Sequence, residues 1–173
     1  MLRRYAGLLE ARPLLTKVVT SGLLLGSGDL CTQAVVDRQV SWRRTGKFAL
    51  LGALVVAPSL HVWYGFLATR FASSVAKRVV LDQFVFAPAF LTGFIFLNSF
   101  LDYGDAGKAA SKVLTEIQPT LGANWLVWIP YQMLNFTFVP VPFQVLANNA
   151  MSLFWNSYLS YSLHRREEEG KVS

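Results

Sequence analysis

Residues 117–163 read IQPTLGANWLVWIPYQMLNFTFVPVPFQVLANNAMSLFWNSYLSYSL and contain no Asp, Glu, Lys or Arg. As a single helix this charge-free run would be about 70 Å long, roughly twice the hydrocarbon thickness of a bilayer. The run nevertheless holds four prolines and eight side-chain amides. In a membrane these polar groups must face other helices or water, because lipid offers them no hydrogen-bond partner. The run therefore predicts an all-α integral membrane protein.

The composition of the whole chain agrees with a membrane location. Of the 173 residues, 53% are hydrophobic and 15% are charged, whereas a soluble domain has about a quarter of its residues charged. The net charge is +6, and the Lys and Arg residues gather between the apolar stretches. Basic residues in that position contact anionic lipid headgroups, so we favour a lipid partner over nucleic acid.

We predict that residues 1–173 form one membrane domain, in which the apolar stretches are the membrane spans. We expect a bundle of four to five transmembrane helices, with an amphipathic helix at the N-terminus and a surface helix near 103–117. The spans are expected near 14–36, 47–69, 83–101 and 143–163, with a short segment at 121–138, a polar tail at 164–173, and loops at 37–47 and 71–82. The short segment crosses the bilayer only if it tilts or extends. Pro140 and Pro142 predict the break before the last span.

Asp29 is the costliest residue inside an expected span. A carboxylate at the centre of a helix costs about 2.5–3.5 kcal/mol on insertion scales, so Asp29 is expected to face the bundle interior. Three roles are open for Asp29. It lines a pore, it forms a structural ion pair or hydrogen-bond anchor, or it lies closer to the membrane–water interface than the expected span places it. We favour the structural pair. Gln33 follows one turn later on the same face, Gly22 and Gly26 form a small-residue pair for close helix contact, and Lys17 is expected to snorkel.

Further polar residues mark other expected spans. We interpret Asp82, with Gln83, as the N-terminal cap of the third span in preference to a selectivity residue. Amides in lipid bond across helices or line a pore, and the sequence leaves both roles open. The candidate residues for a polar interior or pore are Asp29, Gln33, His61, Asp82, Gln83, Gln132, Asn135 and Asn156.

The sequence does not favour an enzyme. It lacks a GxSxG elbow, a P-loop, a GxGxxG turn before a strand and a CxxC pair, and it has only two histidines. A metal site built from several histidines is therefore excluded. We predict no catalytic residue, no cofactor site and no metal ligand.

The C-terminal part carries a specific pattern, NWLVWIPYQMLNFTFVPVPFQ at 124–144 followed by FWNSYLS at 154–160. Together with GSGD at 26–29, PSLHVWY at 58–64 and DQFVFAP at 82–88, it resembles the Mpv17 / PMP22 family of mitochondrial inner-membrane and peroxisomal membrane proteins. The signature residues are Trp125, Trp128, Pro130, Phe136, Pro140, Trp155 and Tyr158. One departure is Gln144, at a position where the family commonly has an arginine.

The resemblance implies a channel-like protein for small solutes or metabolites, linked to mitochondrial homeostasis and without catalytic residues. It implies the mitochondrial inner membrane, with the peroxisomal membrane as the alternative. Membrane lipids, including anionic lipids such as cardiolipin, are the expected partners, along with a second copy of the chain or subunits of a membrane complex. The alternative function is a structural or assembly subunit of a larger inner-membrane complex, which the Gln144 departure favours.

Overall fold

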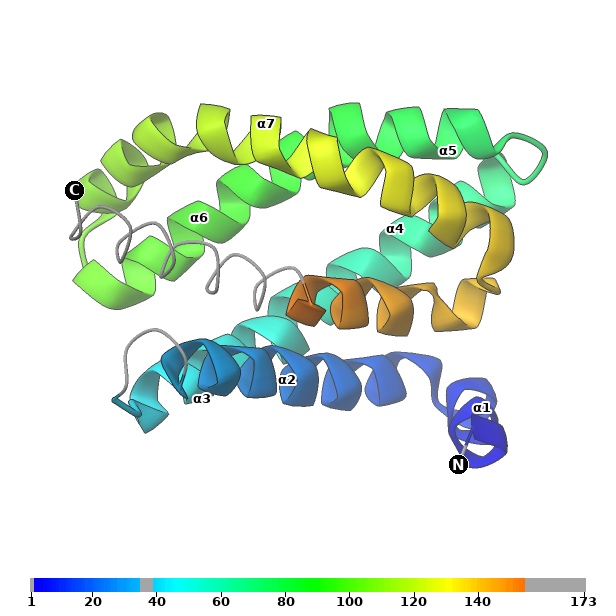
Figure 1. Cartoon of the computed structure of the whole chain (residues 1–173), viewed down its shortest axis with the longest axis horizontal. Helices are drawn as coiled ribbons and strands as arrows, with labels where there is room; N and C mark the ends of the chain where they lie inside the picture. Colours follow the sequence, from blue (N-terminus) through cyan, green and yellow to red (C-terminus); the bar gives the residue numbers. More distant parts are fainter. Residues whose placement is uncertain (1, 35–38, 155–173) are drawn as a thin grey trace, which may run out of the picture. The chain divides into compact units, whose positions relative to one another are not determined.

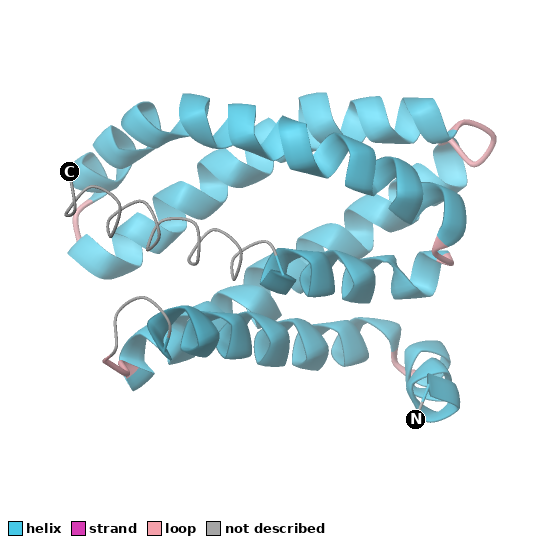
Figure 2. Cartoon of the chain, viewed as in Figure 1, coloured by secondary structure: helices cyan, strands magenta, loops and turns pink. Residues whose placement is uncertain are grey.

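The computed structural model describes residues 2–34 and 39–154. Every regular element in these two ranges is a helix, and the remaining described residues form short turns and loops (Figure 2). This confirms the all-α class. The chain divides into two compact units. The first unit comprises Met1–Gly65 and the chain from Pro140 onward, and the second unit comprises Phe66–Val139.

The first unit begins with α1 (Leu2–Ala11) and α2 (Pro13–Thr32). Pro13 occupies the first turn of α2, where its missing N–H removes no helical bond. After the turn region, α3 (Trp42–Leu51) starts at Ser41, whose hydroxyl accepts the N–H of Arg44. The unit also holds η2 (Gly52–Val56), most of α4 (Ala57–Arg70) and helical residues 141–154.

Small residues bring α2 and α3 together, and the two helices lie side by side (Figure 1). A Cβ at Gly22 would lie 3.1 Å from the carbonyl oxygen of Ala49, and a Cβ at Gly26 would lie 3.2 Å from the Ala49 methyl group. The glycine pair predicted from the sequence therefore sits at a close helix contact, as small residues allow in membrane proteins.

The second unit is built from α5 (Val75–Leu81), η3 (Asp82–Phe86), α6 (Ala87–Tyr103) and α7 (Ala106–Phe138). Helix α6 ends at Gly104, which takes the left-handed conformation at φ 65° that glycine adopts without strain. Asp105 then caps α7 by accepting the N–H of Lys108 at 3.0 Å. The short connection returns α7 along α6, and the two helices pack together.

Both units contain a π-helical turn directly before an Ala-Pro pair. The segments LGALVVAP at 51–58 and LDQFVFAP at 81–88 share this spacing. Pro58 and Pro88 carry no N–H, and a proline ring clashes with the carbonyl four residues earlier. The N–H of Ala57 bonds the Gly52 carbonyl, and that of Ala87 bonds the Asp82 carbonyl, five residues back in each case. The wider turn thus lets the helix continue through the proline.

Three described helical stretches are long and apolar enough to cross a membrane: Pro13–Thr32, Trp42–Arg70 and Val75–Tyr103. They overlap the first three spans expected from the sequence. Two expected loops were too long, because 42–47 belongs to α3 and 75–81 forms α5. In both cases a serine, Ser41 or Ser74, caps the helix earlier than the apolar pattern indicates.

The surface helix expected near 103–117 and the short segment at 121–138 are one continuous helix, α7. Pro119 and Pro130 lie inside it without ending it. The helix stops at Phe138, and Val139 adopts extended backbone immediately before Pro140. This is the place where the sequence predicted a break. Of the last expected span, 143–163, the structure describes the part up to residue 154.

Candidate polar site

In the first unit, a polar stripe runs along α2. Lys17, Ser21, Asp29 and Gln33 are all buried, and their separations are multiples of four residues. Residues four apart share one face of a helix. Each step of four residues turns about 40° around the helix axis, so the stripe winds around α2. Lys17 and Ser21 lie on one side at its start, and Asp29 and Gln33 lie on another side at its end.

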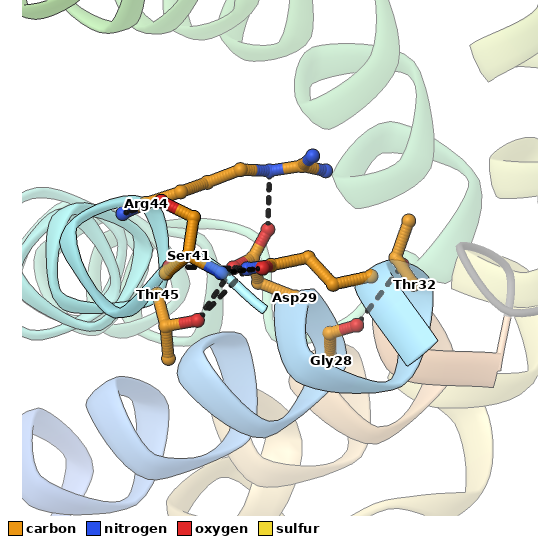
Figure 3. Close-up of polar contacts among 7 residues, drawn as sticks. Gly28, Asp29, Thr32, Ser41, Arg44 and Thr45 are labelled. Carbon is orange, nitrogen blue, oxygen red and sulfur yellow. Dashed lines mark hydrogen bonds and ion pairs between the residues drawn. The ribbon is translucent and has the colours of Figure 1, made fainter. Parts of the chain in front are cut away.

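Asp29 is the centre of the first cluster (Figure 3). One carboxylate oxygen lies 2.8 Å from Nε of Arg44, and the other accepts the hydroxyl of Thr45 at 2.8 Å. The Asp29 side chain is 3% exposed, whereas that of Arg44 is 39% exposed. The buried carboxylate thus binds a cation that reaches toward the surface. This geometry agrees with the ion-pair interpretation of Asp29.

Gln33 completes the Asp29 cluster. Its amide nitrogen donates to the Asp29 carboxylate and lies 3.0 Å from the Thr45 hydroxyl, and its amide oxygen accepts the N–H of Ser41. Gln33 is fully buried. The cluster joins the C-terminal end of α2 to the first turn of α3, and its hydrogen bonds satisfy polar groups that would be costly to bury unpaired.

A second cluster in the first unit surrounds the other end of the stripe. Lys17 Nζ lies 3.0 Å from Nδ1 of His61. Ser21 Oγ accepts the amide N–H of Asn149 at 2.5 Å. Lys17 is only 5% exposed, so its ammonium group does not snorkel as expected but reaches the α4 imidazole. Tyr64, on the same helix as His61, donates its hydroxyl to Asn148 at 2.9 Å.

The second unit has its own buried carboxylate, Asp82. Its Oδ2 accepts the amide N–H of Gln83 at 2.7 Å and that of Gln132 at 3.0 Å. Asn135 in turn donates to the amide oxygen of Gln132 at 2.9 Å. Arg78, one helical turn before Asp82, interacts with it electrostatically. The carboxylate is therefore held by amides from two helices and lies within the electrostatic influence of a buried cation.

The interpretation of Asp82 as an N-terminal cap was wrong. Asp82 has helical backbone angles and lies within the continuous helical stretch from Val75 to Tyr103. Ser74 is the cap, since its hydroxyl accepts the N–H of Lys77 at 3.3 Å. The charge pattern was misleading because Asp82 stands directly before a charge-free run.

Gln83 and Arg78 connect the Asp82 network to two further places on α7. Gln83 accepts from the Asn124 amide at 3.0 Å through its side chain and from the Trp125 indole at 2.8 Å through its carbonyl. Arg78 donates to the Phe136 carbonyl at 3.3 Å and stacks 4.5 Å from that ring. α7 thus carries three networked amides, Asn124, Gln132 and Asn135, which we call the α7 polar line.

Most residues predicted for the polar interior are buried, but they fall into two separate sets. Asp29 and Gln33 belong to the first unit, whereas Asp82, Gln83, Gln132 and Asn135 belong to the second. His61 is half-buried beside Lys17. Asn156 lies outside the described residues, as do Trp155 and Tyr158 of the signature.

Sequence reasoning missed several members of these clusters. They are Ser21, Arg44, Thr45, Tyr64, Arg78, Asn148 and Asn149. The four-residue spacing of Lys17 and Ser21, which places both on one side of α2, was a usable signal. Among the described residues, no group of three or more His, Cys, Asp or Glu side chains could hold a metal ion.

Comparisons with known proteins agree with the resemblance seen in the sequence. Residues 99–160 match the model of the Mpv17 / PMP22 family. Protein sym-1 of Neurospora crassa is 37% identical over 171 residues, covering 93% of this chain and 98% of its own. Peroxisomal membrane protein 2 of Bos taurus is 34% identical, covering 92% and 87%. Protein SYM1 of Saccharomyces cerevisiae is 31% identical, covering 99% and 94%. No solved structure matches.

Proposed function

The chain belongs to the Mpv17 / PMP22 family of membrane proteins, and from this premise we propose that it is a channel-like protein that passes small solutes or metabolites across an organellar membrane. Its location is the mitochondrial inner membrane, with the peroxisomal membrane as the alternative. The SYM1 relatives and peroxisomal membrane protein 2 support this pair of locations. We propose no catalytic step.

The observation that carries the proposal is the polar line on α7. Asn124, Gln132 and Asn135 join Asp82 and Gln83 in one hydrogen-bonded network within the second unit. Asp82 and Gln83 belong to a stretch that is apolar and long enough to span a membrane. Ionisable and amide groups at such positions are costly in lipid, and they commonly mark solute or ion paths.

The chemistry of this line suits small polar solutes with weak selectivity. Amides offer both donors and acceptors, and Arg78 offsets the charge of Asp82. Asn135 Oδ1 is buried and has no hydrogen-bond partner among the described residues, so it can accept a bond from water or a solute. A line of this kind replaces hydration without imposing a strong field on a passing ion.

Asn135→Asp tests the proposal, because it keeps the side-chain size and adds a negative charge to the line. In vesicles containing the purified protein, wild type should release a small entrapped solute faster than empty vesicles do. The variant should shift the preference toward cations, measured as a change in reversal potential under a salt gradient. Gln118→Glu is the matched control, since it adds the same charge at an exposed position of α7. Absence of flux from wild type, or equal shifts in both variants, would contradict the channel.

A second candidate is a structural or assembly subunit of a membrane complex. The first third of α7 favours it, because Leu114 is 80% exposed while Lys112 and Glu116 form an ion pair at 2.6 Å on the same helix. An exposed amphipathic face suits a protein partner, a second copy of the chain or an anionic lipid surface. Extraction in mild detergent followed by native gels separates the two candidates. Migration only at the size of a monomer or small homo-oligomer would count against a complex subunit.

A further inference from the structure

We propose that Lys17, held in place by His61, forms the cationic centre of a binding site for a small oxyanion, such as a carboxylate or phosphate, inside the first unit. The site belongs to the first unit, whereas the α7 polar line that carries the channel proposal belongs to the second unit. The binding of an anion at this site does not depend on the proposed function. Only one further step rests on the proposed function, namely that anionic metabolites are among the solutes that the channel passes.

The argument starts from an imbalance of buried charge. Lys17 and Arg78 are the two buried cations among the described residues. Arg78 interacts with Asp82, one turn away on its helix. Within the described part of the chain Lys17 contacts no carboxylate, and its side-chain partner is the His61 ring. A buried ammonium group without a counter-charge is strongly disfavoured, and a bound anion would supply the missing charge.

The donors around Lys17 fit an oxyanion. An ammonium group has three hydrogens, and the contact with His61 Nδ1 uses one of them. When Nδ1 accepts this bond, the neutral ring carries its proton on Nε2, which points away from the ammonium group. His61 therefore orients the ammonium group, whose two remaining hydrogens can donate to an anion. The Ser21 hydroxyl lies one turn along the same face of α2. Ammonium and hydroxyl groups are both donors to carboxylate or phosphate oxygens.

Asn149 gives an independent sign that this cluster has unfilled hydrogen-bonding capacity. Its amide nitrogen donates to Ser21 Oγ at 2.5 Å, while its oxygen is buried and has no partner among the described residues. Asn149 itself is 2% exposed. Unpaired buried amide oxygens are rare in folded proteins because they cost free energy. A water molecule bound with the anion, or a hydroxyl group of the solute, would satisfy this oxygen.

The burial of the cluster selects the occupant by size. Because Lys17 is 5% exposed and Ser21 is fully buried, we propose a small free anion as the occupant in preference to the headgroup of an intact lipid, which would need a wider opening. The recognised chemistry is therefore a compact carboxylate or phosphate. Arg44 and Asp29 take no part, since they already bind each other on α3 and α2.

Phosphate binding to the purified full-length protein in lipid-free detergent tests the site. The midpoint of thermal unfolding is followed against inorganic phosphate at constant ionic strength. Phosphate should raise the midpoint of wild type. Lys17→Met should weaken the apparent affinity roughly tenfold to a hundredfold, the effect of losing a charge-assisted hydrogen bond. Lys17→Arg should retain most of the binding, and Lys108→Met, at an exposed position of α7, should match wild type.

His61→Ala keeps the test decisive if Lys17→Met does not fold, because it should also weaken phosphate binding. A wild-type protein that phosphate does not stabilise would overturn the site. So would equal stabilisation of wild type and His61→Ala. Solute release from vesicles then separates the two proposals. Binding without any flux removes the channel and leaves the site standing, whereas flux with no phosphate binding removes the site alone.

Discussion

At the scale of single residues, Asp29 shows why a buried carboxylate is retained in an apolar helix. All its partners are donors: the Arg44 guanidinium, the Thr45 hydroxyl and the Gln33 amide. A carboxylate accepts bonds at both oxygens. The sequence correctly indicated a polar partner, because the cost of an unpaired charge is general. It did not identify Arg44, since the pairing depends on how α3 returns along α2.

Asp29→Asn should therefore destabilise the protein despite its equal size. An amide places an N–H group against a donor in either orientation, so at least one hydrogen bond is lost. We expect a loss of about 1–2 kcal/mol, limited by the partial exposure of Arg44. Denaturation of the purified protein in detergent measures it. Thr32→Ala is the control, because within the described residues that hydroxyl bonds only the nearby Gly28 carbonyl, and it should cost about 0.5 kcal/mol or less. Equal effects would show that the Asp29 cluster contributes little.

Two glycines provide a second prediction at this scale. A Cβ at Gly52 would lie 2.7 Å from the Ser21 carbonyl oxygen, a backbone atom that cannot move without shifting α2. Gly52→Ala should thus destabilise by about 1–3 kcal/mol. Gly46, one helix earlier in the chain, has open space at its Cβ position, so Gly46→Ala should stabilise by about 0.5–1 kcal/mol. The same denaturation assay compares them, and a loss at Gly46 would show that helix propensity does not govern this part of α3.

At the scale of elements, prolines set the limits of what the sequence predicted. Pro140 marks a real helix break because Val139 before it is extended. Pro119 and Pro130 do not break α7, and Pro58 and Pro88 are accommodated by π-helical turns. All of these prolines lie in apolar stretches, so the sequence alone does not distinguish a proline that ends a helix from one that a helix accommodates. The difference lies in packing against a neighbouring helix, which a single sequence does not display.

The continuity of α7 gives the prediction at this scale. Spin labels at Lys108 and Leu134, both exposed, are 26 residues apart in the chain, so one unbroken helix places their backbones about 39 Å apart. A break at Pro119, as a separate surface helix would require, gives a much shorter distance. Pulsed electron paramagnetic resonance measures the distance between the two labels, on a variant in which Cys31, also exposed, is replaced by serine. A broad distribution centred well below this value would contradict the single helix.

At the scale of the whole molecule, the charge-free run that opened the sequence is shared between two units. Residues up to Val139 belong to the second unit, and those from Pro140 onward return to the first. The sequence predicted the break at this point. It did not indicate the two compact units, because hydropathy reports which segments are apolar and not which of them pack together. The polar residues divide in the same way, with Asp29 in one unit and Asp82 in the other.

If each unit is stabilised by its own polar cluster, a mutation in one unit should lower the local stability of that unit and leave the other unit unchanged. Gly52→Ala acts on the first unit, so it should speed amide hydrogen exchange in α2 and α3, where its clash with Ser21 arises. Exchange in α6 and α7 should stay near the wild-type rate, because those helices pack on one another and side-chain amides of α7 donate hydrogen bonds to Asp82 and Gln83. Gln132→Leu should give the opposite pattern. Exchange read by mass spectrometry on peptides from each helix measures both. Equal acceleration in all helices for either variant would mean that the chain opens as one cooperative body, because sub-global opening follows the units that share buried contacts.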